Sequence, residues 1–240
     1  MNAASSDGPN YDLGDVDLIE DKPVYQGFFQ IRCLQLRHKL FRGGWSEQIS
    51  RELFVRHDAV GVLLFDPVLD SVALVEQFRV GAFGHELSTR EASAHDANDH
   101  ETFATQAQQQ GKRSPWLLEL VAGLIDKDEP PAIVAERETL EEAGALIDEL
   151  EPIAQYYSSP GGSSEFFHLF CAKVNLAEVG GIHGLDVESE DIRVHVMPVG
   201  EAFSRMQAGE LNNAHTIIAL QWLQLHGATL RKRWLTPAQI

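Results

Sequence analysis

A continuous apolar run, AVGVLLF at residues 59–65, restricts the possible folds more than any other segment of the chain. It ends at Asp66-Pro67, and a second apolar stretch, SVALVEQ, follows at residues 71–77. Strands that are covered on both faces have such uninterrupted runs, whereas strands with one wet face alternate. The two segments therefore predict a hairpin inside a covered sheet.

Further strands and helices are expected after this hairpin. A helix is predicted over residues 131–143, because Pro131 suits a first helical position and Gly144 suits a left-handed C-cap. Apolar patterns predict strands at 116–121, 152–158, 166–174 and 191–198, and helices at 200–209 and 213–227. This mixture predicts an α+β or α/β sandwich.

The chain before the hairpin divides into two segments. Residues 1–22 are acidic and show little periodicity, which predicts a mobile leader. Residues 23–57 largely alternate apolar and polar side chains, which predicts a small antiparallel sheet. Because such a sheet is marginal alone, we expect it to pack on the main domain, residues 58–240, or to act as a dimerisation domain.

A polar segment, residues 84–113, interrupts the strand pattern of the main domain and is interpreted as an insertion. Its histidines, His85, His95 and His100, do not have a common metal-ligand spacing. The expectation is a solvated polar loop with no specific role, which the chain can accommodate because long insertions cost little closure entropy. The alternatives are a segment that caps a binding site or one that alters substrate choice.

The charge balance limits the possible partners. The chain has 36 Asp and Glu residues against 19 Lys and Arg residues, a formal net charge of −17. This charge repels nucleic acids and anionic membranes, so a phosphate-bearing ligand would need a metal ion as intermediary. Neither a signal peptide nor an apolar stretch of membrane-spanning length is visible, and a cytoplasmic location is expected.

The most informative segment is the acidic helix. Glu138, Glu141 and Glu142 are spaced at i, i+3 and i+4, so they share one helix face, where each pair repels by about 2–3 kcal/mol before screening. Hard divalent cations offset such repulsion, and Mg²⁺ is often shared between carboxylates and substrate phosphates. The alternative is a solvated acidic face on which Arg137 pairs with Glu141 or Glu129.

The spacing around this helix is more specific than the three glutamates alone. From Gly123 to Ala145 the sequence matches G-x5-E-x7-R-E-U-x-E-E-x-G-U, where U is usually a bulky aliphatic residue. This pattern resembles the Nudix box of the Nudix hydrolases. Every fixed position is present, but the two U positions hold Thr139 and Ala145.

The resemblance implies roles for residues at matching positions. Glu138 and Glu142 would be direct metal ligands, and Glu141 would be a ligand or would support the ligands. The carbonyl of Ala122 would contact a metal. Glu129 and Arg137 would form the ion pair that fixes the loop before the helix.

A second acidic segment lies at residues 181–192, GIHGLDVESEDI. In an extended loop Asp186, Glu188 and Glu190 would project to one side, although a plain polar turn is the alternative. The resemblance implies that Glu190 completes a metal site and that Glu188 positions or deprotonates the attacking water. Glu141 or Glu142 could serve as the base instead.

Similarity to the ADP-ribose pyrophosphatase subfamily extends over roughly residues 24–235. The sequence ELVAG leads into the pattern, and SSPGG at residues 158–162 follows it. This comparison implies that Arg51 and Arg79 contact phosphate or the terminal ribose. It also implies that Phe28 or Phe29 stacks on adenine and that Glu165 binds ribose hydroxyls. Structural roles, in the core of the small sheet or at a strand end, are the alternatives.

The resemblance therefore implies an α+β fold, the α/β/α sandwich of the Nudix type, with a small N-terminal antiparallel sheet. It implies a homodimeric enzyme that uses Mg²⁺, or Mn²⁺ as a substitute, to hydrolyse ADP-ribose to AMP and ribose 5-phosphate. The alternatives are a hydrolase of another nucleotide sugar and a non-catalytic Nudix-like nucleotide sensor. No nucleic acid or membrane partner is expected.

Overall fold

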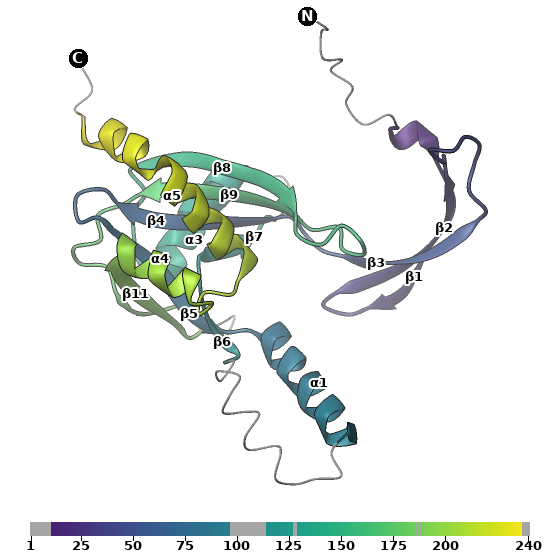
Figure 1. Ribbon diagram of the computed structural model, residues 1–240, viewed down its shortest axis with the longest axis horizontal. Coiled ribbons are helices and arrows are strands. Elements are labelled where there is room, and N and C mark those ends of the chain that lie inside the picture. The colour runs from purple at the N-terminus through teal and green to yellow at the C-terminus, as the bar shows by residue number, and fades with distance from the viewer. Residues whose placement is uncertain (1–10, 97–113, 127–128, 186, 188, 237–240) are drawn as a thin grey trace, which may run out of the picture. The chain divides into compact units, whose positions relative to one another are not determined.

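The computed structural model describes residues 11–96, 114–126, 129–185, 187 and 189–236, with the backbone alone at 89–96 (Figure 1). The chain forms two compact units. The first unit comprises Met1–Asp58 and Tyr156–Phe167, and the second comprises Ala59–Gln155 and His168–Ile240.

The first unit contains a three-stranded antiparallel sheet in the order β1-β2-β3. Its strands are β1 (Val16–Gln26), β2 (Gln30–His38) and β3 (Ile49–Val55). None of the residues in these strands is fully buried within the single chain. A three-stranded sheet without a core of its own is marginal in water, so its apolar side chains need another surface.

The expectation of a mobile leader over residues 1–22 is wrong for residues 13–22. A short 3₁₀ helix spans Leu13–Asp15, and β1 follows it directly. The acidic residues that suggested a leader instead pair across the sheet: Asp21 accepts from Arg32 at 2.5 Å and Asp17 pairs with Arg37 at 2.8 Å. Residues 1–10 lie outside the described part.

The larger, eight-stranded sheet has the order β10-β11-β5-β4-β9-β8, with β6 paired to β5 and β7 paired to β4. Its strands are β4 (Ala59–Asp66), β5 (Ser71–Phe78), β6 (Trp116–Glu119), β7 (Val121–Leu124), β8 (Glu149–Tyr157), β9 (Phe166–Lys173), β10 (Gly181–His183) and β11 (Ile192–Pro198). The helices are α1 (Val80–Asp96), α3 (Pro131–Ala143), α4 (Val199–Gln207) and α5 (Ala214–Leu235).

Helices cover both faces of this sheet, as Figure 1 shows for α3 and α5. Val62 and Leu64 of β4 share a buried cluster with Ala135 and Ala143 of α3. Because strand side chains alternate between faces, the neighbouring Phe65 points the other way, where its ring lies 6.1 Å from that of Trp234 in α5. The predicted α+β sandwich is confirmed.

The predicted central hairpin and acidic helix are also confirmed. Every residue of β4 is buried, and β4 pairs with β5 in antiparallel register. Helix α3 has the predicted limits, and Gly144 ends it in the left-handed conformation with φ of 62°. Helix α5 continues beyond the predicted end at residue 227, and the short strands β7 and β10 were not predicted.

One irregularity in the sheet positions the site. Strand β5 pairs with β4 only next to the turn, at residues 71–73, and pairs with β6 from Val75 onwards. Strand β7 pairs with the other end of β4, where Gly61 lies opposite Ala122. The segment 116–124 is thus inserted between two strands that separate, and its second half runs beside α3.

The polar segment 84–113 is not a loop throughout, because α1 covers residues 80–96. Val80, Phe83 and Leu87 recur at helical spacing, and Phe83 contacts Phe78 with ring centroids 6.0 Å apart. The loop expectation is therefore wrong for residues 84–96, including His85 and His95, while 97–113, with His100, lie outside the described residues. No helix in the described part of the chain is long and apolar enough to cross a membrane.

Candidate active site

Helix α3 places its acidic residues around one arginine. The guanidinium of Arg137 lies 2.8 Å from Glu138, 3.1 Å from Glu141 and 3.6 Å from Glu129. The Glu129 contact is an ion pair without a hydrogen bond to the nearer oxygen. The Glu129–Arg137 pair and the Arg137–Glu141 pair are both present, so one cation partly neutralises three carboxylates.

The backbone of β7 passes close to the same helix face. The N–H of Ala122 donates to Oε2 of Glu142 at 3.0 Å. A Cβ placed on Gly123 would lie 1.9 Å from Oε1 of Glu138, so glycine is the residue that fits here. The sheet irregularity thus brings the main chain at Ala122–Gly123 against two of the expected metal ligands.

Burial raises the pKa of two of these carboxyls. The pKa of Glu142, which is 2% exposed, rises to about 8, chiefly because burial disfavours its charged form. The Ala122 N–H opposes this rise, and the charges of Glu138 and Glu190 add to it. Burial likewise raises the pKa of Glu138 to about 7, against the opposing charge of Arg137. Both groups would gain from a cation beside them.

The loop before β11 is connected to α3. The N–H of Gly184 donates to the main-chain carbonyl of Glu141, and the N–H of Leu185 donates to Oε2 of Glu190, each at 3.3 Å. Glu190 also lies near enough to raise the pKa of Glu138 and of Glu142. Glu188, the expected base, and Asp186 lie outside the described residues.

Arg79 follows β5 and extends toward the same group. Its Nε donates to Oε1 of Glu119 at 2.5 Å. Its charge partly offsets the rise in the pKa of Glu142 that burial causes. Oε2 of Glu119 accepts from the side-chain amide of Asn213 at 2.8 Å. Sequence reasoning did not assign a role to Glu119 or Asn213. The available signal was a carboxylate within an apolar strand, WLLELV.

These side chains have the donors that a hard divalent cation requires. In the described residues, no group of three His, Cys, Asp or Glu side chains already forms a metal site. However, Glu138, Glu142 and Glu190 are electrostatically coupled, and two of them have raised pKa values. Carboxylate oxygens are the ligands preferred by Mg²⁺ and similar ions, so the residues fit such a group.

Three of the expected substrate residues belong to the first unit. The ring of Phe28 is 88% exposed and meets Phe29 edge to face at 4.8 Å. Arg51 is exposed on β3 and donates to the carbonyl of Ser50. Glu165 pairs with Arg56 at 2.9 Å and accepts from Ser158 at 2.6 Å. Sequence reasoning missed Arg56, which anchors Glu165.

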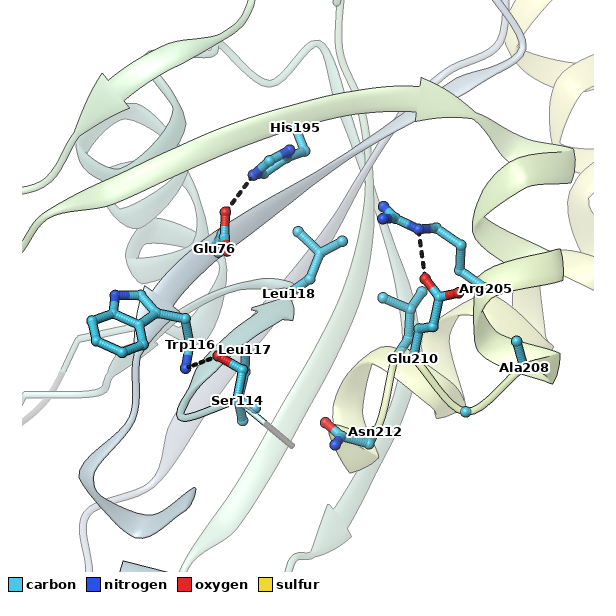
Figure 2. Close-up of a pocket in the computed structure, with 12 residues that line it drawn as sticks. Glu76, Ser114, Trp116, Leu117, Leu118, His195, Arg205, Ala208, Glu210 and Asn212 are labelled. Atoms are coloured by element: carbon cyan, nitrogen blue, oxygen red, sulfur yellow. Dashed lines mark hydrogen bonds and ion pairs between the residues drawn. The ribbon is translucent and has the colours of Figure 1, made fainter. Parts of the chain in front are cut away.

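A separate hollow of about 430 Å³ lies in the second unit (Figure 2). It is lined by Glu76, Leu118 and His195 of the sheet, by Arg205 of α4 and by residues 208–212 after α4. Glu76 and His195 are hydrogen-bonded at 2.8 Å. None of the carboxylates of α3 lines this hollow.

Residues 95–220, more than half of the chain, match the family model described as NUDIX domain. The chain belongs to the Nudix family. Helix α3, with the loop before it, therefore carries the Nudix box that the spacing from Gly123 to Ala145 indicated.

Curated relatives match this Nudix protein along most of its length. An ADP-ribose pyrophosphatase of Haemophilus influenzae is 41% identical over 220 residues, which cover 92% of this chain and 91% of the relative. The ADP-ribose pyrophosphatase of Escherichia coli K12 is 39% identical, with 92% and 93% covered. A GDP-mannose pyrophosphatase of Cronobacter sakazakii is 32% identical, with 88% and 96% covered.

A solved structure supports the fold. The crystal structure of an ADP compounds hydrolase superposes with a TM-score of 0.61 at 17% identity, covering 92% of this chain and 99% of that chain. At this identity the likeness concerns the architecture alone. The matched 92% of this chain includes residues of both units.

Proposed function

We propose that this Nudix protein hydrolyses the diphosphate bond of ADP-ribose and releases AMP and ribose 5-phosphate. The observation that carries the proposal is the coupled carboxylate group of Glu138, Glu142 and Glu190 beside the backbone of Ala122–Gly123. The choice of ADP-ribose is supported by the relatives of that name, which match over nine-tenths of the chain.

A divalent cation, for which we propose Mg²⁺ with Mn²⁺ as a substitute, would be held by Glu138, Glu142, Glu190 and the carbonyl of Ala122. When bound, it would neutralise the diphosphate and lower the pKa of a water. Glu141 would support these ligands through Arg137, which already pairs with it at 3.1 Å.

The remaining chemistry is a displacement at phosphorus. A water molecule loses a proton to a carboxylate, its oxygen bonds to one phosphorus, and the bridging P–O bond breaks to release the two monophosphates. We propose Glu188 as the proton acceptor, with Glu141 or Glu142 as alternatives. The Glu129–Arg137 pair would keep the loop before α3 in place during this step.

Substrate contacts are proposed for four residues. The exposed ring of Phe28 has a free face for adenine, with Phe29 at its edge. Arg79 and Arg51 would bind phosphate or the terminal ribose, because guanidinium groups form paired hydrogen bonds with phosphate oxygens. Glu165, held by Arg56, would accept from ribose hydroxyls.

A homodimer is proposed from the first unit. Its sheet exposes Leu18, Val24 and Tyr25, each more than half accessible within one chain. A second copy is the partner that would always be present to cover them. The cytoplasmic location stays a prediction from sequence.

The proposed activity can be tested with a substrate panel. The full-length protein is assayed with ADP-ribose, ADP-glucose, NADH, diadenosine polyphosphates and GDP-mannose, each with and without Mg²⁺, and the products are quantified. The expected result is metal-dependent release of AMP from ADP-ribose at the highest kcat/KM. The absence of turnover of every compound with metal present would exclude the enzyme and favour a nucleotide sensor.

Two variants in the same assay test the assigned roles. Glu142→Gln should lose most of kcat and need more Mg²⁺, because a metal ligand is removed. Glu188→Gln should lose kcat at an ordinary Mg²⁺ requirement. Full activity of Glu188→Gln would move the base to another carboxylate.

A further inference from the structure

Glu119 is a buried carboxylate that the proposed chemistry does not use. It is 3% exposed at the end of β6, and burial raises its pKa. Its two oxygens have different partners: Oε1 accepts from Nε of Arg79 at 2.5 Å, and Oε2 accepts from Nδ2 of Asn213 at 2.8 Å. A charge this deeply buried is retained only when partners of this kind hold it.

The orientation of Asn213 is fixed from the other side. Asn213 is the N-cap of α5, and its Oδ1 accepts from the N–H groups of His215 and Thr216 at 3.0 and 3.4 Å. Because the amide oxygen is committed to the cap, the NH₂ group must face Glu119. The start of α5 therefore determines where the carboxylate of Glu119 lies.

Arg79 is held at two points. Its main-chain N–H donates to the carbonyl of Pro115 at 2.8 Å, and its side-chain Nε donates to Glu119. A guanidinium has five N–H donors, and no described residue accepts from the four on the terminal nitrogens of Arg79, which can bind another ligand. Its charge also acts on Glu142 of α3, which places the group near the proposed metal ligands.

Glu119 therefore keeps the guanidinium of Arg79 from moving toward the carboxylates of α3. Without this carboxylate, the cationic side chain of Arg79 would be drawn toward the acidic face of α3, where Glu142 and Glu138 would attract it. In that position the guanidinium of Arg79 would neutralise the metal ligands, and its terminal N–H groups would no longer face a phosphate. A fixed guanidinium also loses less side-chain entropy on binding.

We propose that Glu119, itself held by Asn213, is a positioning residue that orients the guanidinium of Arg79 toward the diphosphate of the substrate. The inference rests on the proposed ADP-ribose hydrolysis and names a determinant of substrate affinity at that site. Glu119 acts through Arg79 and does not touch the substrate.

The test is a double-mutant cycle between Glu119→Gln and Arg79→Ala, measured as KM and kcat for ADP-ribose with saturating Mg²⁺. With Arg79 present, Glu119→Gln should raise KM by about tenfold, with a much smaller change in kcat. In the Arg79→Ala background the same substitution should change KM by less than about twofold, because its target is gone.

A second variant keeps the test independent of folding defects at residue 119. Asn213→Asp retains the capping oxygen but replaces the donor facing Glu119 with another acceptor. It should raise KM in the same direction, and again only when Arg79 is present. Circular dichroism and thermal unfolding establish that each variant is folded.

Glu76→Gln is the matched control. Glu76 lies in β5, three residues before Arg79, and pairs with His195 in the hollow of Figure 2. Its substitution should leave KM unchanged in both backgrounds. Equal fold-changes for Glu119→Gln with and without Arg79, or an unchanged KM, would overturn the positioning role. A wild-type protein that does not turn over ADP-ribose would instead refute the proposed function.

Discussion

Three glutamates of the second unit are largely buried, and each is compensated differently. Glu119 has two hydrogen-bond donors, one of them charged. Glu138 has the guanidinium of Arg137. Glu142 has the single main-chain N–H of Ala122. Because Glu142 is the least compensated of the three, it should gain most from a metal ion.

This difference predicts a pH dependence of stability in the metal-free protein. The pKa of Glu142 is raised to about 8 from the ordinary glutamate value of 4.5, so the folded state binds this proton more tightly than the unfolded state does. The stabilisation that the protonated Glu142 gives to the folded state is complete below pH ~4.5 and is lost as the pH rises through about 8. In the presence of a metal chelator, the free energy of unfolding, measured by urea titration, should therefore decline as the pH rises between these values.

Glu142→Gln separates this residue from the other titrating groups. The decline should be shallower in the variant, because glutamine does not ionise. Added Mg²⁺ should reduce the pH dependence of the free energy of unfolding of the wild type, since a cation stabilises the ionised carboxylate. Parallel curves for the wild type and the variant would contradict a raised pKa at this position.

The residues of the site were predictable to different degrees. The spacing from Gly123 to Ala145 identified the carboxylates of α3 because the pattern is local, within one loop and one helix. Glu119–Asn213 and Arg56–Glu165 join positions far apart in the chain. A single sequence does not reveal such long-range pairs, so the anchors of Arg79 and Glu165 were missed.

At the scale of elements, the contact between β7 and α3 defines the site. Strand β7 follows β6 in the space where β4 and β5 separate, and it lies against the carboxylate face of the helix. Gly123 is the point of closest approach, because its missing side chain leaves room for Glu138.

Gly123→Ala should therefore impair metal binding more than folding. The added methyl group would overlap the flexible end of Glu138 and displace its carboxylate. We expect a melting temperature within a few degrees of wild type and a Mg²⁺ requirement raised by about tenfold or more. A Mg²⁺ titration of activity, with calorimetric binding as a second readout, measures the effect.

Gly200→Ala in α4 is the control for Gly123→Ala. A Cβ at Gly200 meets no atom within 4 Å, so the metal requirement should not change. An equal metal requirement in the Gly123 and Gly200 variants would show that Glu138 does not need its present position.

Elements were predicted well where pattern and packing agree. The run at 59–65 and the helix at 131–143 combine strong periodicity with clear end signals. The acidic N-terminal strand was missed because its charges are paired by Arg32 and Arg37 of β2. Helix α1 was missed because the polar composition of 84–113 concealed the stripe of Val80, Phe83 and Leu87.

At the scale of the whole molecule, the two units differ in how they bury apolar surface. The second unit has a core between its sheet and helices on both faces. The first has a sheet whose strands contain no fully buried residue within the single chain. That contrast is the physical basis for proposing a dimer.

The dimer predicts a definite result in solution. Size-exclusion chromatography with light-scattering detection should give twice the chain mass for the wild-type protein at micromolar concentration. Leu18→Glu combined with Val24→Glu should give the mass of a single chain, because charges on the exposed sheet would oppose burial. Leu225→Glu, at an exposed position on α5, should stay dimeric. A monomeric wild type would exclude the proposal.

The segment Tyr156–Phe167 belongs to the first unit although it includes the end of β8 and the start of β9 in the larger sheet. Within that unit, the main chain of Phe54 bonds to Gly162 and Ser164, and Arg56 holds Glu165. A protein shortened to start at Ala59 would retain this segment but lose every one of those partners. The N-terminal sheet is therefore not a detachable module. A recombination event or a domain graft that moved it without residues 156–167 would separate Phe54 and Arg56 from the loop residues that they bind.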